Sequence, residues 1–355
     1  MRILGIETSC DETSIAVLSL IQPKLKLEAF TVASQTKLHA RWGGVVPEVA
    51  ARQHSQVIIP LLHHTLQQAG VQPAAIDVVA VTQGPGLITA LQVGVETAKA
   101  LAAAWCKPII GVNHIAGHMV SPFLATSSWP LATRKMTWPA VALIVSGGHT
   151  ELYLMSSITS WKLLGKTLDD AAGEAFDKVG KMLKLPYPGG PKVAQLAQQG
   201  RADAFDLPRP LLQNKNCDFS FAGLKTAVLY ALQKENQKKL RTSGQVLVAD
   251  MCASFQQAAI DVLVGKAVRA VQQTRAKSLI VSGGVSANQA LRARLQRETE
   301  QQLKGVKLLF PELRFTGDNA AMIALAGALA VNSRKTLGKK GWAKLQANAN
   351  WELWN

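Results

Sequence analysis

The chain has few cysteines for its 355 residues. The four, Cys10, Cys106, Cys217 and Cys252, are scattered and form no CxxC pair. This spacing excludes a zinc knuckle and a disulfide framework, and unpaired thiols are typical of the reducing cytoplasm.

Long apolar segments are also missing from the N-terminus, where Glu7, Asp11 and Glu12 would interrupt the core of any signal peptide. The sequence predicts no apolar stretch of membrane-spanning length, so we expect a cytoplasmic protein without a membrane partner. Aromatic residues make up only 6% of the chain against 48% hydrophobic residues. An interior of Ala, Val, Leu and Ile is typical of α/β proteins.

Acidic residues are scarce: 23 stand against 39 lysines and arginines, a formal net charge of +16. This excess favours a polyanionic partner such as nucleic acid, or else an acidic protein. It is concentrated in two clusters, which could be solvated faces or RNA contacts. The clusters are Lys234, Lys238, Lys239 and Arg241, and Arg334, Lys335, Lys339, Lys340 and Lys344.

Each half of the chain opens with a strand, a polar turn and a returning strand. The polar, proline-punctuated stretch Ala125–Pro139 separates the halves, which predicts domains at 1–125 and 126–338 and a basic, tryptophan-containing tail at 339–355. The expected strands are residues 2–7, 14–20, 77–82, 108–112, 140–145, 151–155, 277–282 and 307–310, and the expected helices are 87–105, 174–183, 250–275, 289–299 and 319–331. This alternation predicts an α/β protein of two lobes that face a shared nucleotide cleft.

Two turns of the same composition, Ser146-Gly147-Gly148 and Ser282-Gly283-Gly284, follow expected strands. Glycines there let backbone N–H groups approach phosphate oxygens, which favours nucleotide binding. Asn288 follows the second turn and could cap the next helix or hydrogen-bond a base or ribose.

Two histidines, His114 and His118, follow the expected strand 108–112 at a spacing of four residues. On a helix this spacing places both imidazoles on one face, where they could hold a divalent metal, although a chance pairing is an equal alternative. The residue after His114 is Ile115, so the general base of the zinc-protease motif is missing.

Asp318 precedes the expected helix 319–331 and could simply be its N-cap. If it came from the far lobe to face the histidine pair, it would complete a two-histidine, one-carboxylate set with open positions. Such a set suits iron(II) or another first-row metal.

Taken together, these residues resemble the TsaD family, also called Gcp or YgjD, the tRNA N6-adenosine threonylcarbamoyltransferases. The resemblance covers nearly the whole chain, apart from an apparent insertion at Ala125–Thr137 and the tail with Trp342, Trp351 and Trp354. The motifs that carry it are Gly5–Thr13, Gly43–Glu48, Gly84–Leu87, the His114/His118 pair, Val145–Thr150, Asp169–Lys178, Tyr187–Pro191, Phe219–Lys225, and the Asn288 and Asp318 motifs.

The resemblance implies the actin, sugar-kinase and Hsp70-like (ASKHA) fold. It further implies transfer of a threonylcarbamoyl group from threonylcarbamoyl-AMP to N6 of the adenosine 3′ of the anticodon (A37), in tRNAs that read codons beginning with A. His114, His118 and Asp318 would bind one divalent metal, with iron(II) preferred over zinc or magnesium. The residues implied for the adenylate, or for ATP or AMP, are Ile144, Val145, Ser146, Gly147, Gly148, Asp177, Gly190 and Asn288.

The implied partners are tRNA, the TsaB and TsaE proteins, and a TsaC-type enzyme that supplies the adenylate. Asp11 and Glu12 are candidates for the general base or for orienting the substrate, because a carboxylate near a cation should stay ionised and can accept a proton. Stabilisation of their turn is the alternative. A metalloprotease like the O-sialoglycoprotein endopeptidases is disfavoured by the missing glutamate. A sugar or acetate kinase would give the histidines no task, and a tRNA-binding scaffold would not explain the glycine turns.

Overall fold

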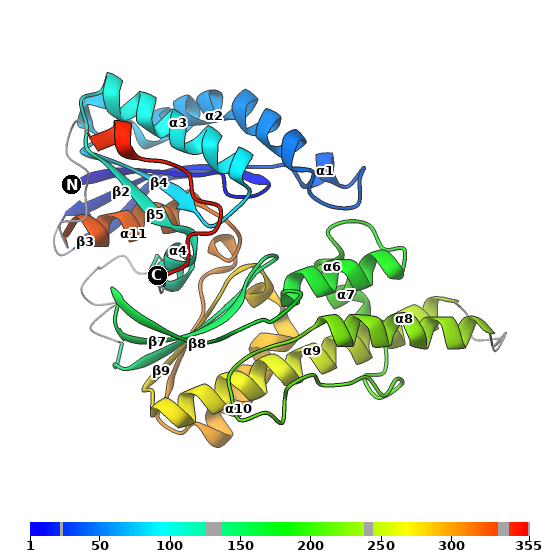
Figure 1. Cartoon of the computed structure of the whole chain (residues 1–355). Coiled ribbons are helices and arrows are strands. Elements are labelled where there is room, and N and C mark those ends of the chain that lie inside the picture. The colour runs from blue at the N-terminus through cyan, green and yellow to red at the C-terminus, as the bar shows by residue number, and fades with distance from the viewer. Residues whose placement is uncertain (22–23, 125–135, 238–243, 333–340, 354–355) are drawn as a thin grey trace. The chain divides into compact units, whose positions relative to one another are not determined.

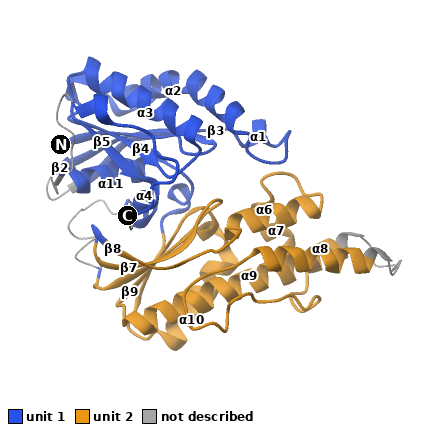
Figure 2. Cartoon of the chain, viewed as in Figure 1, with its two compact units in different colours: residues 1–136, 158–160, 311–355 blue, residues 137–157, 161–310 orange. Residues whose placement is uncertain are grey.

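The computed structural model describes the chain except for residues 22–23, 125–135, 238–243, 333–340 and 354–355. The fold consists of two compact units (Figure 2). Unit 1 comprises Met1–Met136, Ile158–Ser160 and Pro311–Asn355, and unit 2 comprises Thr137–Ser157 and Trp161–Phe310.

The units differ from the expected ranges 1–125 and 126–338 because the chain returns to unit 1 at Pro311. Helix α11 (Ala320–Asn332) packs against strands β1 and β2 of unit 1. The described part of the expected tail belongs to unit 1 as well. Most of the predicted insertion at 125–137 lies outside the described residues.

Unit 1 contains a sheet in the order β3-β2-β1-β4-β5 (Figure 1). The antiparallel part is the expected hairpin extended by a third strand, and β4 and β5 continue the sheet in parallel. Alternating apolar residues such as Leu4, Ile6 and Val81 are fully buried in its core. The strands are β1 (Arg2–Glu7), β2 (Glu12–Ile21), β3 (Lys24–Ser34), β4 (Val78–Gly84) and β5 (Ile109–Asn113).

Helices α2 and α3 pack on this sheet and on each other, and α11 packs against β1, β2, β4 and β5. Helix α2 ends where Gly70 adopts a left-handed conformation with φ of 63°, which glycine tolerates without strain. The helices are α1 (Thr36–His39), α2 (Pro47–Ala69), α3 (Ile88–Ala104) and α4 (His114–Val120), with short 3₁₀ turns at Pro73–Ala75, Ser121–Phe123, Leu313–Phe315 and Gly341–Lys344.

Unit 2 repeats the topology of unit 1, with the order β10-β9-β6-β7-β8. Here β6 pairs antiparallel with β7 and parallel with β9, as β1 does with β2 and β4. The repetition confirms the predicted duplicated α/β fold of the actin, sugar-kinase and Hsp70-like class. The strands are β6 (Ala140–Val145), β7 (Thr150–Ser157), β8 (Ser160–Lys166), β9 (Ser278–Ser282) and β10 (Lys307–Leu309).

Helix α9 (Gly244–Thr274) forms the centre of unit 2 and packs against α7, α8, α10, β6, β7 and β9. Its segment Leu247–Thr274 is apolar enough and long enough to span a membrane, so the expectation that no stretch reaches that length was wrong. Of its most apolar 18-residue window, 78% is buried within the fold, as for the core helix of a globular protein. The other helices are α6 (Ala172–Met182), α7 (Gly189–Ala197), α8 (Ala222–Gln237) and α10 (Gln289–Gln302), with a 3₁₀ turn at Gly284–Ala287.

Candidate metal and nucleotide sites

Helix α4 presents the histidine pair at the carboxyl end of strand β5. The helix starts there because the Asn113 side chain accepts hydrogen bonds from the backbone N–H groups of Ile115 and Ala116. His114 and His118 are 4% and 0% exposed, and their ring centroids lie 4.7 Å apart. Two buried imidazoles on one short helix are therefore held side by side, as the spacing predicted.

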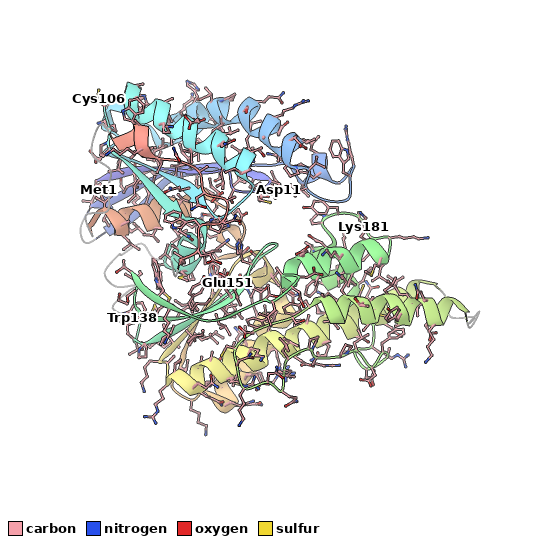
Figure 3. The ribbon with its side chains drawn as sticks, in the orientation of Figure 1. Met1, Asp11, Cys106, Trp138, Glu151 and Lys181 are labelled. Carbon is pink, nitrogen blue, oxygen red and sulfur yellow. The ribbon has the colours of Figure 1, made fainter. Side chains whose placement is uncertain are left out.

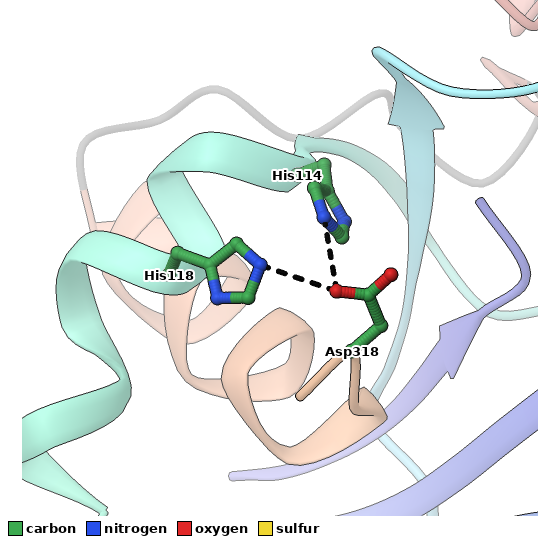
Figure 4. Close-up of side chains that lie close together, drawn as sticks. All are labelled: His114, His118 and Asp318. Carbon is green, nitrogen blue, oxygen red and sulfur yellow. Dashed lines mark hydrogen bonds and ion pairs between the residues drawn. The ribbon is translucent and has the colours of Figure 1, made fainter. Parts of the chain in front are cut away.

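Asp318 lies against both histidines (Figure 4). Its Oδ1 atom is 3.3 Å from Nε2 of His114 and 3.2 Å from Nε2 of His118. The structure thus brings together the three predicted ligands, whose donor atoms all lie within 4.8 Å of one another.

Two expectations about Asp318 need correction. It belongs to unit 1, as the histidines do, and so does not come from a far lobe. Nor does it cap α11: the neighbouring Asn319 does so, because its Oδ1 accepts a hydrogen bond from the N–H of Met322 at 3.0 Å. The Asp318 carboxylate is consequently available to the histidines.

Glu7, which the sequence did not single out as a functional residue, contacts His114 at the ring nitrogen that faces away from Asp318. Its side chain is fully buried at the end of β1, and its Oε2 atom lies 3.0 Å from Nδ1 of His114. The carboxylate also accepts hydrogen bonds from the Thr82 hydroxyl and the Ser9 backbone N–H. A carboxylate at the second ring nitrogen is the usual support of a metal-binding histidine, because it fixes the tautomer and orients the ring.

The charges in this cluster depend strongly on one another. Burial lowers the pKa of His114, but the Asp318 and Glu7 carboxylates on either side outweigh burial and raise it to about 10. Burial would raise the pKa of Asp318, yet the His114 charge and hydrogen bonds from both histidines hold it well below its usual range. Burial lowers the pKa of His118, which is therefore neutral. A proton on His114 accordingly balances the carboxylates in the metal-free chain.

The residues fit a bound cation. The buried Nδ1 atom of His118 has no hydrogen-bond partner among the described residues, whereas its Nε2 faces Asp318. Two imidazoles and one carboxylate on one side of a site are the donor set that first-row divalent metals take. Such a metal would replace the proton of His114 as the positive charge between the carboxylates.

The turn between β1 and β2 ends with Asp11, and Glu12 is the first residue of β2 (Figure 3 labels Asp11). Buried His54 pins this turn, with Nε2 3.0 Å from the Cys10 carbonyl and Nδ1 2.7 Å from the Thr13 hydroxyl. Burial, followed by the charge of Asp318, raises the pKa of Asp11. In the metal-free chain, burial and Asp318 thus act against the ionised form expected for Asp11.

The pKa of Glu12 is raised to about 8 by burial first and then by Asp11 and Asp318. Between pH 4.5 and 8 the folded chain keeps a proton that the unfolded chain releases, so stability should fall as pH rises through this window. We expect metal-free Glu12→Gln to be more stable than the wild type by about 1–2 kcal/mol at pH 9, after allowance for solvent screening. At pH 4 the two should be equal.

Urea unfolding in the presence of a chelator would measure this difference. Glu300→Gln, a change at an exposed residue of α10, is the control and should have little effect at either pH. Equal stabilities of Glu12→Gln and the wild type at pH 9 would contradict the raised pKa.

Unit 2 contains a pocket of about 780 Å³, a size typical of small-molecule sites. Its walls are mostly apolar, with a few amide groups and the carboxylate of Asp177. The lining residues are Gly147, Gly173, Phe176, Asp177, Pro188, Gly190, Pro191, Ala194, Gln195, Gln198, Gln256, Gly284, Val285, Ala287, Asn288, Gln289 and Ala290.

Half of the residues predicted for the adenylate line this pocket: Gly147, Asp177, Gly190 and Asn288. The other four are not among its lining residues. Ile144 and Val145 are fully buried in β6. The Ser146 hydroxyl accepts a hydrogen bond from the N–H of His149 in the same turn. Gly148 follows the lining residue Gly147 in the chain but does not itself line the pocket.

Asp177 and Asn288 shape the pocket through their hydrogen bonds. The Asp177 carboxylate accepts a hydrogen bond from the N–H of Gly190 at 2.9 Å, which joins α6 to the start of α7. Asn288 caps α10 by accepting from the N–H of Leu291, so the capping alternative is correct. Its amide also donates to Gln256 Oε1 at 2.7 Å, a wall contact with α9 that the sequence did not reveal.

The basic clusters are mostly outside the described residues. Only Lys234 of the first cluster and Lys344 of the second fall within them. In the tail, Trp342 packs against the core of unit 1, whereas Trp354 lies outside the described part of the chain.

Comparison with known proteins bears on both sites. The sequence model described as TsaD: tRNA N6-adenosine threonylcarbamoyltransferase matches residues 26–325. Proteins with that name from Albidiferax ferrireducens and Polaromonas sp. are each 46% identical to this chain, over 99% of the chain and 98% of their own lengths. The solved structure of YeaZ from Pseudomonas aeruginosa covers 46% of this chain and 63% of its own, at 21% identity and a TM-score of 0.29, a similarity too low to support an argument.

The family model spans most of the chain, and the relatives match it from end to end at high identity. The residues of both candidate sites, except Glu7, Asp11 and Glu12, lie within the range that the family model covers. On this basis the chain belongs to the TsaD family, the tRNA N6-adenosine threonylcarbamoyltransferases.

Proposed function

We propose that the chain transfers a threonylcarbamoyl group from threonylcarbamoyl-AMP to N6 of A37 in tRNAs that read codons beginning with A. It is an acyl-type transferase, and the modified nucleoside is threonylcarbamoyladenosine, t6A. The observation that carries the proposal is the presence, in a member of this family, of a nucleotide-sized pocket and a two-histidine, one-carboxylate cluster.

In the proposed reaction the N6 amine attacks the carbamoyl carbon, the bond from that carbon to the phosphate oxygen breaks, and AMP leaves. The amine is a weak nucleophile because its lone pair is delocalised into the purine. Its proton must therefore be removed as the new C–N bond forms.

The pocket of unit 2 is the proposed site of the adenylate. Its apolar walls suit a flat base, and the amides of Gln195, Gln198 and Gln256 are groups that can hydrogen-bond a base or a ribose. Gly147 and Gly284 carry no side chain, so their backbone leaves room for a phosphate to approach. Asn288 acts in this proposal mainly by holding the wall in place, because its amide already bonds Gln256.

His114, His118 and Asp318 are the proposed metal ligands, and iron(II) is the proposed ion on the basis of the donor set. A divalent metal held there would supply a Lewis acid that polarises a carbonyl or phosphoryl oxygen. The residues of the chain hold the site: Glu7 orients the His114 ring through Nδ1, and burial keeps His118 neutral and able to bind through Nε2.

Asp11 and Glu12 are the proposed acceptors of the amine proton. A general base works best when its pKa lies near the working pH, and the pKa of Glu12 is raised to about 8. A cation bound to Asp318 would cancel the charge that helps to raise both carboxylates, which would release them to act as bases.

The structure gives a further reason to disfavour the metalloprotease alternative. Glu7 is the glutamate that contacts the histidines, but its oxygens already accept from Ser9, Thr82 and His114. Fully buried and bonded in this way, it orients His114 through Nδ1 and is not placed to activate a water molecule. The proposed partners are TsaB and TsaE, with a TsaC-type enzyme as the source of the adenylate, in the cytoplasm.

Nucleoside analysis would test the proposed function. The purified chain, TsaB, TsaE, threonylcarbamoyl-AMP and unmodified tRNA should yield t6A when the tRNA is digested to nucleosides and analysed by mass spectrometry. Omission of the chain is the control and should yield none. Absence of t6A under every combination of partners would overturn the proposal.

A further inference from the structure

The C-terminal segment Gly341–Leu353 is bound along unit 1, and in Figure 1 it runs beside β5 and ends near α4. Its first part is anchored in the core, where Leu345 is 3% exposed and Trp342 and Ala347 pack alongside. A Cβ atom at Gly111 of β5 would collide first with the Gln83 side chain and would also come within 2.9 Å of the Leu345 side chain, so glycine leaves room for both. The sheet therefore has a position shaped to admit this segment.

The middle of the segment is hydrogen-bonded to the end of β4 and to the turn that follows it. The N–H of Asn348 donates to the Gln83 carbonyl at 2.8 Å, and the Gln83 side chain donates to the Gln346 carbonyl at 2.9 Å. The N–H of Gly86 donates to the Ala349 carbonyl at 3.2 Å. These bonds fix the segment across the carboxyl ends of the parallel strands.

Glycine at position 84 is needed because of this segment. A Cβ atom there would collide with the Asn348 carbonyl. The Gly84-Pro85-Gly86 turn, part of the motif Gly84–Leu87, thus forms the surface on which the C-terminal segment lies.

The last contact reaches the metal-binding helix. The Asn113 side chain, 4% exposed, donates from Nδ2 to the Trp351 carbonyl at 2.9 Å. Its Oδ1 atom accepts from the N–H groups of Ile115 and Ala116. One amide therefore caps α4 and ties it to the C-terminal segment. Because this amide is buried, water could not easily replace the Trp351 carbonyl if the segment were removed.

We propose that the segment from Gln346 to Leu353 is a strap that positions the His114/His118 helix for metal binding, through the amide of Asn113. The proposal rests on the proposed metal site. In this proposal the strap acts by holding the cap of α4. Loss of groups that orient metal ligands typically lowers metal affinity by about 10–100-fold.

A pair of truncations provides the test. A chain that ends at Leu345 keeps Trp342 and Leu345 of the core anchor and loses the strap, whereas a chain that ends at Leu353 keeps every described contact and is the matched control. Asn113→Ser is the second variant: serine can still cap α4, but its hydroxyl is too short to reach the Trp351 carbonyl as well. If the chain that ends at Leu345 does not fold, Asn113→Ser alone provides the test.

Two readouts separate the strap from a purely structural role. In the metal-free chain, hydrogen exchange at the amides of Ile115 and Ala116 should become at least tenfold faster in both variants. With Co²⁺ as the probe, followed by its visible absorption, the affinity should fall about tenfold or more under conditions where urea unfolding shows the variants to be folded. The chain ending at Leu353 should match the wild type in both.

Unchanged amide exchange, or Co²⁺ affinity within twofold of the wild type in folded variants, would overturn the strap. If the wild type itself does not bind Co²⁺, the metal proposal fails, and the amide exchange of α4 still decides whether the strap holds the helix.

Discussion

Asp318→Ala should remove most of the metal from the purified protein and slow threonylcarbamoyl transfer by about a thousandfold. Lewis-acid polarisation is worth several kcal/mol in a transition state, and each 1.4 kcal/mol is a factor of ten. The fold should survive, because Asn319 rather than Asp318 caps α11. Loss of the partner of His118 should cost about 1–3 kcal/mol of stability.

Metal analysis by plasma mass spectrometry and the t6A assay would be run on the same preparation. Asp203→Ala, which removes an exposed acid of unit 2, is the control and should keep both metal and activity. A full metal content in Asp318→Ala would remove Asp318 from the ligand set.

Gly284→Leu should weaken binding of ATP or AMP by at least tenfold, about 1.4 kcal/mol, without a large loss of stability. A Cβ atom at Gly284 meets nothing within 4 Å, and the residue lines the pocket of unit 2, so the new side chain would occupy the ligand's space. Calorimetric titration would measure the affinity.

Two neighbouring glycines serve as controls for this prediction. Gly148 also has open space around its Cβ position but does not line the pocket, so Gly148→Leu should reduce affinity less. Gly283 has a φ of 94° and its Cβ would collide with the Val145 backbone, so Gly283→Ala should instead destabilise the fold. Equal nucleotide affinity in Gly284→Leu and the wild type would place the nucleotide elsewhere.

Local patterns in the sequence predicted much of the fold. The strand-turn-strand openings at Arg2 and Ala140 are the hairpins β1–β2 and β6–β7. The short apolar run before His114 is β5, and the four-residue spacing does place His114 and His118 on one helix. These features depend on residues close in sequence, where periodicity and turn composition carry the information.

Contacts between distant residues could not be predicted in the same way. Glu7 looked like the polar end of an apolar strand, and its role depends on His114, 107 residues away. The one sign in the sequence was that an otherwise apolar, buried strand ends in the acidic residue Glu7. Likewise Gln256 is one of many polar residues on α9, and only the fold brings it to Asn288.

The two corrections at Asp318 have the same origin. Sequence order placed this residue in the second half, but α11 completes the first unit by packing on β1 and β2. Asp318 and Asn319 are both good caps by composition, and only the geometry decides that Asn319 takes that role. Domains assigned as continuous ranges of sequence are wrong when the chain returns to the first unit, as it does here at Pro311.

X-ray absorption at the iron edge of the iron(II)-loaded protein tests the central claim most directly, that His114, His118 and Asp318 hold the metal of this transferase. The iron should have only nitrogen and oxygen neighbours, with the scattering pattern of two imidazoles, and one imidazole should be lost in His118→Ala. A sulfur neighbour from a cysteine, or an unchanged spectrum in His118→Ala, would contradict it.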